Sequence, residues 1–87
     1  MTQKEIKNSI NRQVYEFAAT LGYEMADDGD GSTVTFIKPG CSTADETIDY
    51  GRSSHQTCTY NWAPEWVKED ARRIDEFAEQ IVRSFNI

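Results

Sequence analysis

The N-terminal segment carries apolar residues at the spacing of an α-helix. Three or four positions separate each of the following residues from the next: Ile6, Ile10, Val14, Phe17 and Leu21. Such spacing places them on one face of a helix. Thr2 and Glu5 have the spacing of a capping box, in which each side chain accepts a hydrogen bond from the other residue's backbone N–H. Gly22 suits the left-handed conformation that commonly ends a helix, so we predict a first helix between Thr2 and Gly22.

The middle of the chain instead alternates apolar and polar residues in four short segments, 23–26, 32–38, 46–50 and 55–62. This pattern is typical of strands with one buried face, and short turns between consecutive strands predict an antiparallel meander. Alternation assigns these residues to the buried face: Tyr23, Met25, Val34, Phe36, Ile48, Tyr50, Cys58, Tyr60 and Trp62. It assigns these to the open face: Glu24, Thr33, Thr35, Ile37, Thr47, Asp49, His55, Thr57, Thr59 and Asn61.

A second helix is predicted to begin at Pro64, an allowed first helical position. Its apolar face consists of Val67, Ala71, Ile74, Ala78, Ile81 and Phe85. Each helix has one apolar face and each strand one apolar side, so two layers are enough to bury them. We predict a single α+β domain over residues 1–87. Its architecture is a two-layer sandwich of helix, antiparallel sheet of three or four strands and helix, with both helices on one face.

The composition agrees with one small globular domain, since 38% of the 87 residues are hydrophobic and 11% aromatic. No apolar run approaches the roughly 20 residues that span a bilayer, and residues 1–5 do not resemble a signal peptide. We therefore expect a cytoplasmic protein without membrane contact. In that reducing compartment Cys41 and Cys58 are expected to be free thiols, with Cys58 buried. The sequence does not decide whether they form a disulfide with each other, because bridging depends on their separation in space.

Negative charge is concentrated in the middle of the chain. Residues 24–49 hold seven acids and one base, Lys38, a balance of −6. Residues 1–23 sum to +1 and residues 50–87 to −1, so the whole chain carries −6. A concentrated field of one sign governs which partners approach, so the expected partner is basic. The same field disfavours direct contact with nucleic acid, whose phosphates it repels.

No catalytic or metal-binding motif is complete. The turn at residues 27–31 lacks the ligand positions of an EF-hand loop, and Cys41, His55 and Cys58 lack the paired spacing of structural zinc sites. His55 is the only histidine, and we expect it to be a solvated turn residue. The acids of residues 45–49 have no lysine or histidine at matched spacing. We expect no metal, no cofactor and no enzymatic activity.

Residues 21–23 read Leu-Gly-Tyr and residues 30–32 read Asp-Gly-Ser. Together with the order helix–strands–helix, they resemble the start of small ribonuclease toxins that share the topology of double-stranded-RNA-binding domains. In the toxin family a catalytic histidine follows the glycine-serine pair, where this chain has Thr33. RNA-binding domains place a basic cluster at the start of their last helix, whereas residues 64–70 are acidic. The resemblance implies the topology and carries over neither catalysis nor RNA binding.

These observations favour a small acidic binding protein that inhibits or regulates a partner with a basic surface, such as a nucleic-acid enzyme. Its carboxylates would mimic phosphates in a nucleic-acid-binding groove, a profile found among phage and mobile-element inhibitors. The residues expected at the interface are Glu24, Asp27, Asp28, Asp30, Asp45, Glu46 and Asp49, together with the partly exposed aromatic Trp66.

The sequence is also compatible with two other kinds of protein. The first is an assembly module that forms a homodimer or binds a subunit through its strand edges and through Trp66, Phe77 and Phe85 of the last helix. The second, least favoured, is a small nuclease-like enzyme centred on His55 or on the acids of residues 45–49.

Overall fold

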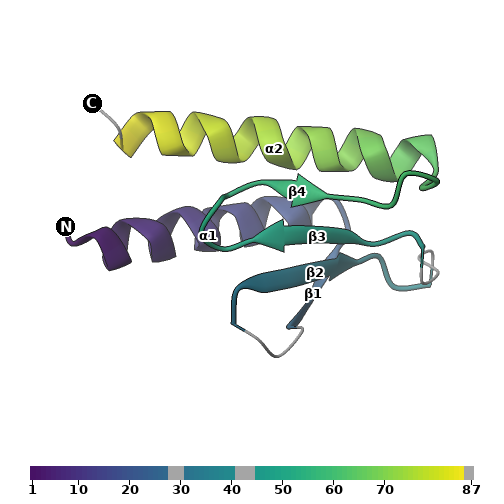
Figure 1. Cartoon of the computed structure of the whole chain (residues 1–87), viewed down its shortest axis with the longest axis horizontal. Helices are drawn as coiled ribbons and strands as arrows, with labels where there is room; N and C mark the ends of the chain where they lie inside the picture. Colours follow the sequence, from purple (N-terminus) through teal and green to yellow (C-terminus); the bar gives the residue numbers. More distant parts are fainter. Residues whose placement is uncertain (28–30, 41–44, 86–87) are drawn as a thin grey trace.

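The structure, a computed structural model, describes residues 1–27, 31–40 and 45–85. Its elements follow in the order α1 (Gln3–Thr20), β1 (Glu24–Asp27), β2 (Thr33–Ile37), β3 (Ile48–Gly51), β4 (Thr57–Cys58) and α2 (Glu65–Phe85). The four strands pair antiparallel in the order β1-β2-β3-β4 (Figure 1). The predicted α+β class and antiparallel meander are therefore confirmed.

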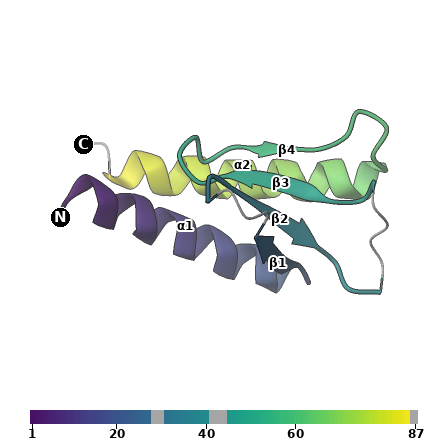
Figure 2. The same ribbon diagram turned by 60° about the horizontal axis from the view of Figure 1, so that its bottom comes forward.

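The two helices lie next to each other along the strands (Figure 2), and one hydrophobic core is shared by both helices and the sheet. It contains Ile10, Val14, Ala18, Tyr23, Val34, Phe36, Ile48, Tyr50, Ala63, Val67, Ala71, Ile74, Ala78 and Ile81. On β2 and β3, Val34, Phe36, Ile48 and Tyr50 are at most 1% exposed. Because alternate residues of a strand face opposite sides, this arrangement fits both helices on one face and leaves the other face open.

Both helix boundaries follow their local signals. The capping box of α1 is present: Thr2 Oγ1 accepts from Glu5 N–H at 3.1 Å, and Glu5 Oε1 accepts from Thr2 N–H at 3.3 Å. Gly22 follows the helix with φ 96°, in the left-handed region that favours glycine. At the start of α2, the Pro64 carbonyl accepts from the backbone N–H of Val67 at 3.0 Å. The prediction for the first helix is confirmed, and α2 begins at Glu65, one residue after the predicted Pro64.

The predicted fourth strand is wrong in length and in orientation. Only Thr57–Cys58 pairs with β3, with Cys58 opposite Asp49 and Thr57 opposite Tyr50. Thr57 therefore shares a side with the buried Tyr50, the reverse of the prediction, because a change of one residue in register exchanges the two faces. Two hydrogen bonds hold Thr57 on this side of the sheet: the Asp75 carboxylate of α2 accepts from the Thr57 backbone N–H at 2.7 Å and from its hydroxyl at 2.8 Å.

Four residues predicted in the core are exposed: Met25, Cys58, Tyr60 and Trp62. Met25 lies opposite Phe36, as alternation requires, but β1 is an edge strand with no further strand beside it. Tyr60 and Trp62 lie beyond the two paired residues of β4. Strand alternation does not govern their side chains there, and they are free to turn outward.

The contact between Thr57 and Asp75 predicts a stability effect. Asp75→Ala leaves the Thr57 N–H and hydroxyl without their carboxylate, and we expect it to lower the free energy of unfolding by about 1–3 kcal/mol. Glu76→Ala removes the same charge from the exposed side of α2 and should change stability by less than about 0.5 kcal/mol. Urea denaturation monitored by circular dichroism measures both. Equal effects of the two substitutions would contradict a specific role for Asp75.

Candidate functional site

One end of the molecule gathers most of its exposed aromatic surface. Helix α1 begins and α2 ends at the same side of the molecule (Figure 1). We call the opposite side the distal end; it comprises the start of β1, the end of β2, the start of β3, residues 59–64 and the first turns of α2. Tyr60, Trp62 and Trp66 lie there, 45%, 66% and 37% exposed.

Tyr60 and Trp62 form an exposed aromatic stack. Their ring centroids are 4.9 Å apart and their planes differ by 26°. Beside Tyr60 is a small hollow of about 110 Å³, lined by Thr47, Asp49, Cys58, Thr59 and Tyr60. Thr35 orients the carboxylate of Asp49 by donating from its hydroxyl to Oδ1 at 2.9 Å. Rings beside a carboxylate are a combination that suits a guanidinium or ammonium group.

A second hollow of about 650 Å³ is lined by Lys38, Glu46, Trp66 and Asp70. The Lys38 ammonium lies 4.9 Å from the ring centroid of Tyr23 and 5.1 Å from that of Trp66. It is also 3.7 Å from Asp70 Oδ2, which accepts a hydrogen bond from the Tyr23 hydroxyl at 2.7 Å. Burial, followed by the hydrogen bond to Asp70 and its charge, raises the pKa of Tyr23 well above its usual value. The phenol therefore stays protonated and remains a donor.

The predicted interface residues do not form one cluster. Glu46 and Trp66 line the same hollow, and Glu24 and Asp45 lie at the same distal end. Asp49 lies on the open face, opposite Thr35 of β2. Asp27 ends β1 at the other end of the sheet, opposite Val34, while Asp28 and Asp30 lie outside the described residues. The meander thus separates the two halves of the acidic segment.

Four residues of the distal end are not among the predicted interface residues: Lys38, Tyr60, Trp62 and Asp70. Alternation along a continuous strand over residues 55–62 predicts that Tyr60 and Trp62 point inward, but β4 ends at Cys58. Lys38 did carry a signal, since it is the only base among residues 24–49. Nothing local distinguishes Asp70 from the other acids of α2, because its role depends on Tyr23, 47 positions away.

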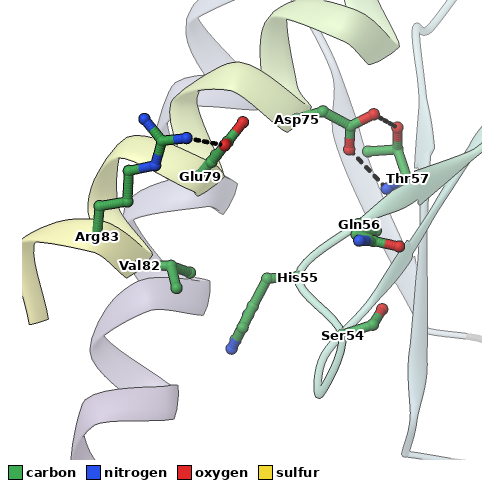
Figure 3. A pocket seen from close by; sticks show the side chains of 8 residues that line it. All are labelled: Ser54, His55, Gln56, Thr57, Asp75, Glu79, Val82 and Arg83. Atoms are coloured by element: carbon green, nitrogen blue, oxygen red, sulfur yellow. Dashed lines mark hydrogen bonds and ion pairs between the residues drawn. The ribbon is translucent and has the colours of Figure 1, made fainter. Parts of the chain in front are cut away.

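His55 is not the solvated turn residue that the sequence predicted. Its φ of 57° is left-handed, and its ring turns away from Ser54 (Figure 3). Nδ1 lies 3.0 Å from the Tyr50 hydroxyl and 3.0 Å from Asn11 Oδ1. The Tyr50 hydroxyl donates to the same Asn11 oxygen at 2.8 Å. These contacts half-bury His55 in a polar cluster between β3, the following turn and α1.

A hollow of about 570 Å³ adjoins this cluster (Figure 3). It is lined by Ser54, His55, Gln56, Thr57, Asp75, Glu79, Val82 and Arg83. Its charged side chains have local partners: Asp75 binds Thr57 and Glu79 binds Arg83. The distal end, with exposed rings and carboxylates, is therefore the stronger candidate for a functional site.

Within residues 1–27, 31–40 and 45–85, no group of three or more histidine, cysteine or acidic side chains is arranged to hold a metal ion. Neither helix of this described part combines the length and apolar character needed to cross a membrane. The chain matches no protein-family model, no curated protein and no solved structure.

The polar cluster predicts a pH dependence of stability. Burial, and secondarily the positive charge of Lys7, lowers the pKa of His55 from 6.5. Between the lowered pKa and 6.5 the folded state binds fewer protons than the unfolded state. The contribution of His55 to the free energy of unfolding is therefore complete above pH 6.5 and is lost as the pH falls through this window. We expect the free energy of unfolding to decrease between about pH 7.5 and about pH 5.5.

Urea denaturation at several pH values measures this effect. His55→Asn is the matched variant, because asparagine tolerates a positive φ and does not titrate. The decrease between the two pH limits should be smaller in the variant. An identical decrease in both proteins would assign the pH dependence to other groups.

Proposed function

We propose that this chain is a small acidic protein that binds a protein partner with a basic surface and regulates it. The distal end is the docking surface. The observation that carries the proposal is the stack of Tyr60 and Trp62, which are 45% and 66% exposed although they lie on a chain with a well-filled core. Tyrosine and tryptophan are the residues most enriched at the energetic centres of protein interfaces.

The charges around this stack favour a cationic partner. Glu24, Asp45 and Glu65 are exposed carboxylates of the distal end, and Asp49 lines the hollow beside Tyr60. The whole chain carries −6. Attraction between this field and a basic surface would speed association and orient the two proteins. The rings would then supply most of the affinity once they are covered.

The partner class that fits this chemistry is a cytoplasmic enzyme that binds nucleic acid. Its groove must be basic to hold phosphates, so carboxylates at the rim of the distal end would take the positions of phosphates. Regulation would then be competitive, since the enzyme could not hold its substrate and this chain together. Glu24, Asp45, Glu46, Asp49 and Trp66 remain in the proposed interface. Asp27, at the other end of the sheet, and its neighbours in sequence Asp28 and Asp30 do not.

The aromatic stack provides the first test. A tagged chain is used to capture proteins from lysate of the cell that makes it, or of the host if the source is viral, and captured proteins are identified by mass spectrometry. Tyr60→Ala with Trp62→Ala should weaken the complex with the main basic partner by at least about 30-fold, as for loss of an interface hot spot. Tyr60→Phe with Trp62→Phe keeps two stacked rings and should retain most of the affinity.

Two outcomes would contradict the proposal. One is equal binding by the alanine and phenylalanine variants. The other is a partner that binds this chain and its nucleic acid simultaneously, as an electrophoretic mobility assay would show. Light scattering of the free chain tests the alternative of self-assembly through the edge strands β1 and β4 or through Trp66, Phe77 and Phe85 of α2.

The two halves of the acidic segment provide the second test. Asp45→Asn, Glu46→Gln and Asp49→Asn together should weaken binding of the captured partner about tenfold and flatten its salt dependence. Asp27→Asn, Asp28→Asn and Asp30→Asn remove the same number of charges and should have a much smaller effect. Because both triple variants have the same net charge, equal losses would show a non-specific charge effect and overturn the assignment to the distal end.

A further inference from the structure

The ammonium group of Lys38 occupies a cage made of two aromatic rings and a carboxylate. Tyr23, just before β1, and Trp66, in the first turn of α2, contribute rings whose centroids lie 4.9 Å and 5.1 Å from Nζ. Asp70, one turn further along α2, contributes a carboxylate oxygen at 3.7 Å. The face of an aromatic ring attracts a cation, and a carboxylate accepts charge-assisted hydrogen bonds from an ammonium group, so this arrangement suits a lysine side chain.

The walls of this cage are held by contacts that do not involve Lys38. Tyr23 is 4% exposed and donates to Asp70 Oδ2 at 2.7 Å. Asp70 is 9% exposed and also lies 3.8 Å from the guanidinium of Arg73 through Oδ1. A ring and a carboxylate therefore stay in position when the ammonium leaves. Lys38 itself follows the last residue of β2 and reaches the cage through a flexible side chain.

The cage is accessible from solvent. It opens into the hollow of about 650 Å³ lined by Lys38, Glu46, Trp66 and Asp70. Trp66 is 37% exposed, and the Lys38 side chain is 27% exposed. An ammonium group that approaches through the hollow meets the rim of the cage without any displacement of the core.

We propose that the cage is a lysine-binding site that the chain's own Lys38 fills in the free protein. On docking, a lysine of the partner replaces Lys38; that this ammonium comes from the partner rests on the function proposed above. Exchange of one ammonium for another leaves the charge of the site unchanged, so Asp70 keeps two cationic neighbours, the bound ammonium and Arg73. Glu46, on the wall of the same hollow, supplies a carboxylate for the displaced Lys38.

A fluorescence titration tests the cage without any partner. Trp62→Phe leaves Trp66 as the only tryptophan of the chain. In this background, Lys38→Ala empties the cage and Lys38→Arg keeps a tethered cation in it. The probe is N-acetyl-lysine amide, and N-acetyl-norleucine amide is the control with the same number of side-chain carbons and no charge. The Lys38→Ala protein should show a saturable change in Trp66 emission at about tenfold lower lysine-amide concentration than the Lys38→Arg protein, because the tethered cation competes.

A saturable response to the norleucine amide of equal strength would overturn the proposal, as would equal responses of the two Lys38 variants or no saturation in Lys38→Ala. Circular dichroism shows whether the variants fold. A second measurement needs no change at Lys38: in an NMR titration of the wild-type chain, lysine amide should shift the Trp66 indole N–H resonance and the norleucine amide should not. Absence of any lysine-specific shift at Trp66 would count against the cage.

The cage and the docking surface can fail separately. If a lysine of the partner replaces Lys38, Lys38→Ala should strengthen the partner complex, because it removes the competing ammonium. Lysine-selective binding in the titration without such strengthening would support the cage but would show that the lysine does not come from the partner. If the variant with Tyr60→Ala and Trp62→Ala captures the partner as well as the wild-type chain does, the proposed docking function is wrong. The amide titration still decides the chemistry of the cage.

Discussion

A buried tyrosine hydroxyl must have a hydrogen-bond partner, and the fold depends on how Tyr50 meets that requirement. Its ring is 0% exposed and packs against Phe36 and Tyr15 at the centre of the core. An unsatisfied hydroxyl there would cost about 1–3 kcal/mol. Asn11 Oδ1 of α1 accepts a hydrogen bond from this hydroxyl, and His55, in the turn after β3, lies within hydrogen-bond distance of it. This cluster links the first helix, the sheet and the turn that leads to β4.

A second buried tyrosine makes a corresponding connection at the distal end. Tyr23, between α1 and β1, donates to Asp70 of α2, and this bond ties the connection between α1 and β1 to the second helix. The carboxylate that satisfies Tyr23 also attracts Lys38, and the ammonium then lies over Trp66 as well. A contact needed for folding thus creates a charged and aromatic surface feature. The proposed lysine exchange uses this feature without disturbing the core.

The meander also imposes a constraint on charge. Successive turns of an antiparallel sheet alternate between its two ends, so Asp27, before β2, lies at the opposite end from Asp45 and Glu46, before β3. The acids of residues 24–49, a segment with a net charge of −6, therefore do not form one surface. Only the acids at the distal end lie beside Tyr60, Trp62 and Trp66. The proposed function therefore rests on aromatic rings and carboxylates that the fold places together, rather than on net charge.

The sequence by itself determined the helices and the two inner strands, because their signals are local. The capping box of Thr2 and Glu5, the positive φ of Gly22 and the alternation around Val34 and Phe36 involve neighbouring residues only. The tertiary structure decided the rest. Asp75 orients Thr57 from 18 positions away, and Asn11 holds His55 from 44 positions away. These contacts set the face of β4 and bury the histidine. Because β4 ends after two residues, Tyr60 and Trp62 turn outward and make the distal end a candidate site. No local pattern encodes these choices, since each depends on hydrogen bonds between residues far apart in the chain.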